Sequence, residues 1–112
     1  MAKEKGAPGG TGMLLLSLLA RRDMYGYEMI EELRTRSNRV FELKAGTLYP
    51  LLHTLEGQGW VVSYDGGAEG GRVRRYYRIT ARGRTALAEK AGEWNAYAAA
   101  VRGVLGGECC GA

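Results

Sequence analysis

Hydrophobic positions recur along the first third of the chain with the period of helices. The segment Gly12–Arg22 is dense in leucine, which predicts a helix buried on more than one side. The segment Tyr25–Ser37 places Met29 or Ile30, and then Leu33, on one face, with charged residues around them. A second amphipathic helix is therefore expected, and the tyrosines at its start are expected to pack against the body.

A third predicted helix, Ala45–Gln58, has two chemically different faces. Gly59 follows it as a suitable C-terminal cap. Pro50 lacks an N–H and belongs in a first turn, so the regular helix is expected to start near Thr47, whose hydroxyl would cap it. The inward face consists of Leu48, Leu51, Leu52 and Leu55. The residues expected elsewhere are Tyr49, Pro50, His53 and Thr54, with Gly46 and Thr47 at the entry.

Strand-like alternation begins directly after this helix. Trp60–Tyr64 and Val73–Ile79 flank a glycine-rich stretch and predict a hairpin, with Trp60 in the core. Val40–Leu43 also alternates and is expected to be a short extended segment. One face of the second strand consists of Val73, Arg75, Tyr77 and Ile79, and the other of Arg72, Arg74, Tyr76 and Arg78. A polar-fronted helix followed by a basic hairpin is the layout of a winged helix-turn-helix, which binds the DNA major groove.

The last predicted helix starts after Thr80, which can cap it, and continues to about Leu105. At about 1.5 Å per residue it extends further than so small a body can cover. One face repeats at steps of four and three residues, which is the seam of a helix that packs on a partner helix. A homodimer through this helix is expected; Gly92 and many alanines weaken the seam, so the first helix is a further candidate for the interface. The seam residues are Leu87, Ala91, Trp94, Ala98, Val101 and Leu105.

The chain of 112 residues is long enough for one domain. We expect a mainly α fold with a small β-hairpin: residues 1–11 a flexible tail, 12–80 the winged helix-turn-helix, 81–106 the dimerisation helix and 107–112 a frayed tail. The net charge is +4, and Arg72–Arg84 contains six arginines and no acid, which favours phosphate contacts. No apolar run or signal pattern indicates a membrane or secretion, so a cytoplasmic location is expected.

The chain has few residues suited to metal binding or catalysis. Its only histidine, His53, has no obvious metal-binding or catalytic partner, and we expect no cofactor and no enzyme activity. Cys109 and Cys110 are adjacent near the C-terminus, and no second pair exists to complete a zinc site. We interpret them as free thiols, with a redox or metal role as the alternative.

Five stretches of the chain occur in the order found in one known family of proteins. They are MYGYEMIEEL (Met24–Leu33), FELKAGTLYPLLHTLEGQGWV (Phe41–Val61), GGRVRRYYRIT (Gly70–Thr80), ARG (Ala81–Gly83) and EW (Glu93–Trp94). On these residues the chain resembles the PadR family of transcriptional regulators, in its short subfamily with a single C-terminal helix.

The resemblance implies a dimeric winged helix-turn-helix repressor of a palindromic operator, often released by a small aromatic or drug-like effector. Family members commonly have a basic residue after His53, where this chain has Thr54. The implied DNA contacts on the third helix are Lys44, Gly46, Thr47, Tyr49, Pro50 and His53. The implied contacts on the hairpin are Gly71, Arg72 and Arg74.

Trp94 has two interpretations. On the seam it is a large hydrophobic anchor between two helices. It also resembles a position in multidrug-binding members of the family, where the tryptophans of two subunits enclose a flat ligand.

The leading hypothesis is a homodimeric repressor whose partners are double-stranded DNA, a second copy of the chain and possible small aromatic ligands. The alternative hypothesis is a winged-helix module that binds other proteins without binding DNA. The arginine cluster argues against that alternative, because a protein interface has no need of so much unpaired positive charge.

Overall fold

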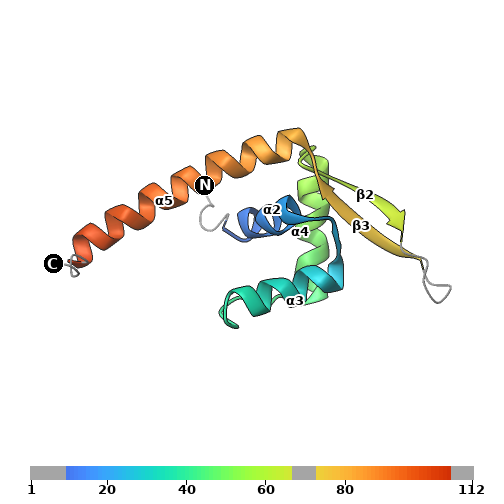
Figure 1. Ribbon diagram of the computed structural model, residues 1–112, viewed down its shortest axis with the longest axis horizontal. Coiled ribbons are helices and arrows are strands. Elements are labelled where there is room, and N and C mark those ends of the chain that lie inside the picture. Colours follow the sequence, from blue (N-terminus) through green and yellow to red (C-terminus); the bar gives the residue numbers. More distant parts are fainter. Residues whose placement is uncertain (1–9, 67–72, 107–112) are drawn as a thin grey trace.

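The computed structural model describes residues 10–66 and 73–106. These residues form four helices and three strands in one elongated molecule, with extents of 57 × 27 × 23 Å. Helix α5 extends well past the group formed by the other helices and the sheet (Figure 1). In chain order the elements are α2 (Gly10–Arg21), β1 (Met24–Tyr25), α3 (Gly26–Arg36), α4 (Ala45–Gly57), β2 (Val61–Gly66), β3 (Arg74–Ile79) and α5 (Ala81–Leu105).

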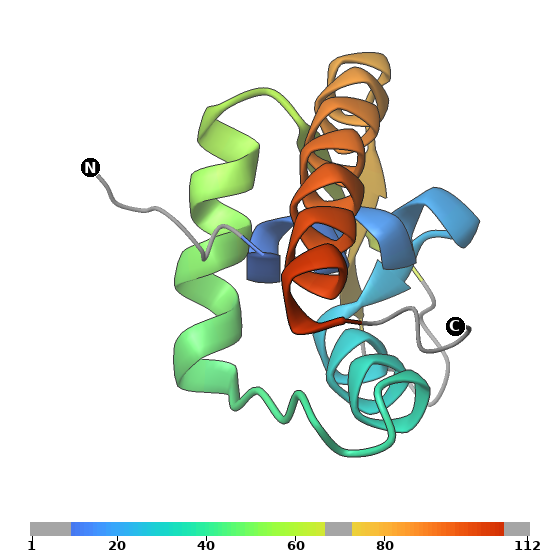
Figure 2. The same cartoon turned by 90° about the vertical axis from the view of Figure 1, so that its left-hand side faces the viewer.

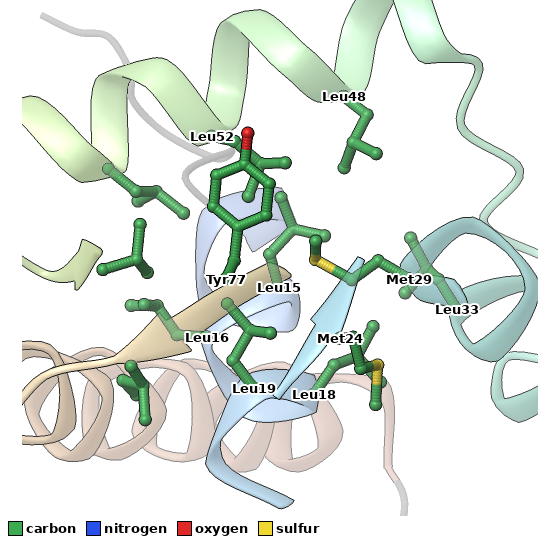
Figure 3. Packing of buried hydrophobic residues seen from close by; sticks show 13 residues of the cluster. Leu15, Leu16, Leu18, Leu19, Met24, Met29, Leu33, Leu48, Leu52 and Tyr77 are labelled. Atoms are coloured by element: carbon green, nitrogen blue, oxygen red, sulfur yellow. The ribbon is translucent and has the colours of Figure 1, made fainter. Parts of the chain in front are cut away.

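Helix α2 occupies the centre of the core. Four of its five leucines, Leu15, Leu16, Leu18 and Leu19, are buried, so the expected burial on more than one side is confirmed. Tyr77 of β3 points toward leucines of α2 and α4 in the same cluster (Figure 3). The remaining members of the cluster are Met24, Met29, Leu33, Leu48, Leu52, Leu55, Val61 and Ile79.

The sheet is antiparallel, with the strand order β1-β3-β2. Its first strand is only two residues long: Met24 pairs with Tyr77 and Tyr25 with Tyr76. The sequence offers too few residues there for a recognisable alternation, so β1 was not expected. Val40–Leu43, expected to be a short extended segment, forms no strand, and Val40 and Phe41 are exposed.

The predicted helix ends are confirmed at two places. The Thr80 hydroxyl accepts a hydrogen bond from the Gly83 N–H at 3.0 Å and caps α5. Gly59 follows α4 with a φ of +79°, the left-handed conformation that favours glycine at a helix C-terminus. At the other end of the chain, α2 begins at Gly10, two residues earlier than expected.

The predicted start of α4 at Ala45 is confirmed, but the expected cap at Thr47 and the expected place of Pro50 in a first turn are wrong. Both Thr47 and Leu48 donate their N–H to the Lys44 carbonyl at 2.9 Å, so the chain is already helical from Ala45. Thr47 therefore provides no side-chain cap, and Pro50 lies inside the helix rather than in its first turn. The hydrogen bond that residue 50 would donate to the Gly46 carbonyl is missing, but this end of α4 is exposed and water can replace it.

Two aromatic residues differ from expectation. Tyr27 was expected to pack at the start of α3, but its side chain points to solvent and is 62% exposed. Trp60 lies at the edge of the core rather than inside it, because it precedes β2 and its side chain is only partly buried. The Lys90 ammonium of α5 lies 5.4 Å from the Trp60 ring centroid and covers part of it.

Candidate nucleic-acid interface

Helix α4 has one apolar face and one open face, as predicted. Leu48, Leu52 and Leu55 are buried, and Leu51 packs partly against the same core. The helix runs along one side of the molecule, and no other described helix or strand covers its outer side (Figure 2). The exposed residues along it and at its entry are Lys44, Gly46, Thr47, Tyr49, Pro50, His53 and Thr54.

The open face is polar and carries no acid in its first two turns. Its side chains include the Lys44 ammonium, the Thr47 hydroxyl, the Tyr49 phenol and the His53 imidazole. The Thr54 hydroxyl instead donates to the Pro50 carbonyl at 3.1 Å, so it is engaged within its own helix. Such a face can donate hydrogen bonds to phosphates and base edges.

The hairpin formed by β2 and β3, which we call the wing, has the predicted inner face at Tyr77 and Ile79 but not at Arg75, which is exposed. The register runs from Val61 opposite Ile79 to Gly66 opposite Arg74. Tyr77 and Ile79 are buried against the core, whereas Val73, expected on the same face, precedes β3 and is 59% exposed. The predicted wing contacts Gly71 and Arg72 lie outside the described residues.

The outer face of the sheet is a continuous layer of tyrosines and arginines from all three strands. The Arg74 guanidinium lies 4.7 Å from the Tyr25 ring centroid, and Tyr25 meets Tyr76 edge-on at 5.5 Å. Tyr76 in turn stacks on Tyr64 at 5.8 Å, with the Arg78 guanidinium 4.9 Å from the Tyr64 centroid. Cation–π contacts thus hold both arginines on the outer surface, where they remain directed away from the core.

Asp23 joins this layer to the end of α2. Its carboxylate accepts hydrogen bonds from the Tyr64 hydroxyl and from Arg78 Nε, the latter at 3.4 Å. The hydrogen bond to Asp23 raises the pKa of the Tyr64 phenol, with a smaller contribution from burial. Within residues 10–66 and 73–106, Arg78 has this acidic partner, whereas Arg74 and Arg75 form no ion pair with a carboxylate. The positive charge of the wing is therefore available mainly at Arg74 and Arg75.

The seam of α5 is largely uncovered in the single chain. Only Gly83 and Ala86 of α5 are buried, and Leu87 packs against the edge of the core. Further along, Trp94 is 52% exposed and Leu105 is 77% exposed. The other seam residues, Ala91, Ala98 and Val101, are partly exposed.

Sequence reasoning missed several residues that the structure brings to these surfaces. Tyr97 lies one turn after Trp94, with ring centroids 5.7 Å apart, and its spacing of three residues could have indicated this. Asp23, Tyr64 and Gly26 acquire their contacts only through the fold, and no local pattern marks them.

Over the described ranges, no three or more His, Cys, Asp or Glu side chains gather closely enough to hold a metal ion. No helix in the described part of the chain has the length and apolar character needed to cross a membrane.

Known proteins resemble this arrangement in sequence and in structure. The Transcriptional regulator PadR-like family matches residues 15–89. The transcriptional regulator Rv3488 of Mycobacterium tuberculosis is 39% identical over 94 residues, which cover 84% of this chain and 81% of that protein.

Two solved structures show the same fold. A transcriptional regulator from Clostridium thermocellum is 34% identical with a TM-score of 0.77, and the match covers 85% of this chain and 92% of that one. A PadR family transcriptional regulator from Eggerthella lenta is 35% identical with a TM-score of 0.75, and the match covers 88% and 83% of the two chains. The winged-helix fold expected from the sequence is confirmed, and these relatives are regulators rather than enzymes.

Proposed function

The chain belongs to the PadR-like family of transcriptional regulators, and on this premise we propose that it is a homodimeric repressor that binds a palindromic DNA operator. The observation that carries the proposal is the open face of α4. Three buried leucines hold the helix on the body while its polar side remains uncovered beside the basic wing. This is the geometry of a recognition helix that enters the major groove.

The residues of the two elements have different roles in this proposal. Tyr49 and His53 contact base edges, because they project from the exposed side of α4. Lys44 and Thr47 bind phosphates at the entry of the helix, where free amides and the helix dipole also favour an anion. Gly46 and Pro50 allow close approach to the backbone of the DNA, and Arg74 acts with Gly71 and Arg72 from the wing.

The uncovered seam supports the homodimer. A single chain leaves Trp94, Tyr97, Val104 and Leu105 exposed on one helix, and a group of exposed apolar side chains of this kind marks an interaction site. Packing two α5 helices against each other would bury these residues and would place two recognition helices on one duplex. Two-fold symmetry of the protein then requires a palindromic operator.

Binding measurements on two single variants test the DNA contacts. We expect Arg74→Ala to weaken binding to all DNA sequences and to lower the slope of log K against log salt by about one. We expect Tyr49→Ala instead to narrow the affinity ratio between a selected operator and random DNA by about tenfold. The measurement is a fluorescence-anisotropy titration of labelled duplexes at several salt concentrations.

The outcome also separates the repressor from a protein-binding winged helix. If Arg74→Ala leaves both the affinity and the salt slope unchanged, the wing does not bind phosphate. If the wild-type chain selects no sequence from a random duplex library, the protein-interaction module becomes the better hypothesis.

Trp94 supports a second element of the proposal, an effector bound at the centre of the dimer. Its ring is half-exposed beside Tyr97, and the next turns of the helix carry mainly alanines, which leave room for a flat molecule. Planar aromatic compounds should quench the tryptophan fluorescence of the wild type. The quenching should disappear in Trp94→Phe and persist in Trp60→Phe; quenching that survives in Trp94→Phe would leave Trp94 as a packing residue alone.

A further inference from the structure

Gly26, in the MYGYE segment, is the first residue of α3 and is buried. A Cβ placed on it would lie 2.7 Å from Cζ and 3.2 Å from Cε1 of Tyr49, and closer still to the Tyr49 hydroxyl oxygen. These separations are too short for real atoms, so the Tyr49 ring occupies the space that any other residue would need for its side chain.

The requirement for glycine here is steric rather than conformational. Within the described residues, the glycines with positive φ are Gly59 and Gly106, and Gly26 is not among them. An alanine could therefore adopt the backbone of Gly26 without strain, but its methyl group would collide with Tyr49. The clashing atoms belong to the end of the Tyr49 side chain, and Tyr49 is 47% exposed, so a methyl group at position 26 would displace the ring toward solvent.

Tyr49 is thereby divided between two environments. Its hydroxyl end lies against the N-terminus of α3, while 47% of its surface stays exposed on the open face of α4. Contact at one end restricts the rotation of the side chain before any DNA is bound. A side chain ordered in advance loses less conformational entropy when it binds, which strengthens and sharpens its contact.

We propose that Gly26 is a positioning residue for DNA recognition: the absence of its side chain leaves the space that holds the hydroxyl end of Tyr49 against α3, and this contact fixes the exposed part of the Tyr49 ring on the open face of α4. This inference rests on the proposed function, since it assigns to Gly26 control over a base-contacting residue. Gly26 itself is buried and does not touch the DNA. Its substitution should therefore alter sequence preference more than general affinity for DNA.

The test is a double-mutant cycle between positions 26 and 49 in the full chain. The operator is selected from a random duplex library with the wild type, and affinities are measured for it and for a scrambled duplex. We expect Gly26→Ala to reduce the ratio of these affinities about tenfold, while its affinity for the scrambled duplex changes less than about twofold. In the Tyr49→Ala background, Gly26→Ala should change the ratio less than about twofold, because the residue it displaces is already gone.

A matched control is Gly57→Ala, which also replaces a helical glycine in this region. A Cβ at position 57 meets nothing within 4 Å, so the ratio should remain that of the wild type. If Gly26→Ala does not fold, the double variant Gly26→Ala/Tyr49→Ala should restore folding, since it removes the ring from the path of the methyl group. Failure of the double variant to fold would overturn the proposed contact between Gly26 and Tyr49.

A measurement without DNA completes the test. In the wild type, nuclear Overhauser effects should connect the Tyr49 ring protons with the Gly26 Hα protons, and their absence would overturn the proposed contact. A wild type that selects no sequence overturns the proposed function and the recognition role together. If the wild type does select a sequence, two results would overturn the positioning role alone. One is an unchanged ratio of operator to scrambled-duplex affinity in Gly26→Ala, and the other is additive effects of the two substitutions in the cycle.

Discussion

Helices α4 and α5 differ in what covers their apolar residues. The apolar side of α4 is buried by the same chain, with Leu48 and Leu52 completely inaccessible to solvent. Much of the apolar side of α5 is uncovered: Trp94 is 52% exposed and Leu105 is 77% exposed. The residues from α2 to β3 therefore form a unit that buries its apolar side chains within one chain, whereas the apolar face of α5 requires a second surface.

The two helices should therefore respond to different experiments. Removing an apolar side chain from α4 affects the folding of each chain, because its neighbours belong to that chain. Removing one from the exposed part of α5 affects assembly, because within the chain the side chain touches little. Measurements of unfolding and of association can distinguish the two cases.

The largest expected effect is on folding. Leu52→Ala should lower the free energy of unfolding by about 2–5 kcal/mol, because it opens a cavity among residues that cannot fully collapse into it. Urea unfolding followed by circular dichroism at low protein concentration measures this loss. Leu105→Ala, measured in the same way, should change the stability by less than about 0.5 kcal/mol. Equal losses in the two variants would show that α5 is covered within its own chain.

A smaller effect is expected on association. Trp94→Ala should raise the dissociation constant of the dimer about 30-fold, which corresponds to about 2 kcal/mol for a central aromatic residue of an interface. Sedimentation velocity over a range of concentrations measures it. The control is Glu89→Ala, because Glu89 is exposed on α5 away from the seam, and this variant should leave the dissociation constant unchanged. A Trp94→Ala dimer as tight as the wild type would exclude this seam as the interface.

The smallest effect concerns pH and lies within the one-chain unit. The hydrogen bond to Asp23 raises the pKa of Tyr64 above its ordinary value of 10.0, so the unfolded chain releases this proton first as the pH rises. The stabilisation by this hydrogen bond is complete below about pH 10, and it is lost as the pH rises through the higher pKa of Tyr64 in the folded chain. Urea unfolding at alkaline pH should therefore show a shallower loss of stability in Tyr64→Phe than in the wild type.

Burial also raises the pKa of Tyr77, so part of the alkaline loss should remain in the Tyr64→Phe variant. Because both tyrosines lie in the unit from α2 to β3, the slope of the unfolding free energy against pH should not depend on protein concentration. Equal slopes of stability against pH in the wild type and in Tyr64→Phe would show that the hydrogen bond between Tyr64 and Asp23 contributes nothing to folding.

Much of the fold could be predicted because its signals are local. The leucine spacing of α4, the alternation of β3 and the Thr80 cap each involve residues close together in the chain, and all three are confirmed. The strand β1 could not be predicted, because two residues carry no periodicity and Met24 pairs with Tyr77 only once the fold brings them together. The expected cap at Thr47 was wrong for a related reason: the preference of proline for a first turn is weaker than the packing of Leu48 in the core.

The exposed surface of α4 followed from the sequence in the same way. Once the leucines were assigned inward, the positions of Tyr49 and His53 on the opposite side followed from the helical period. The neighbours of those residues did not follow, because Gly26 and Tyr49 are 23 positions apart and meet only through packing of α3 on α4.

The sequence by itself determined the buried leucines of α2 and α4, the helix that presents a polar face and the helix that carries an uncovered seam. These properties depend on the period of a helix or strand and on the free energy of removing apolar side chains from water, and both act over short stretches of chain. Only the tertiary structure decided that Asp23 holds Tyr64 and Arg78, that Tyr25 lies beneath Arg74, and that Gly26 accommodates Tyr49. Such contacts join distant segments through the exact fit of close-packed atoms, which no local pattern in the sequence records.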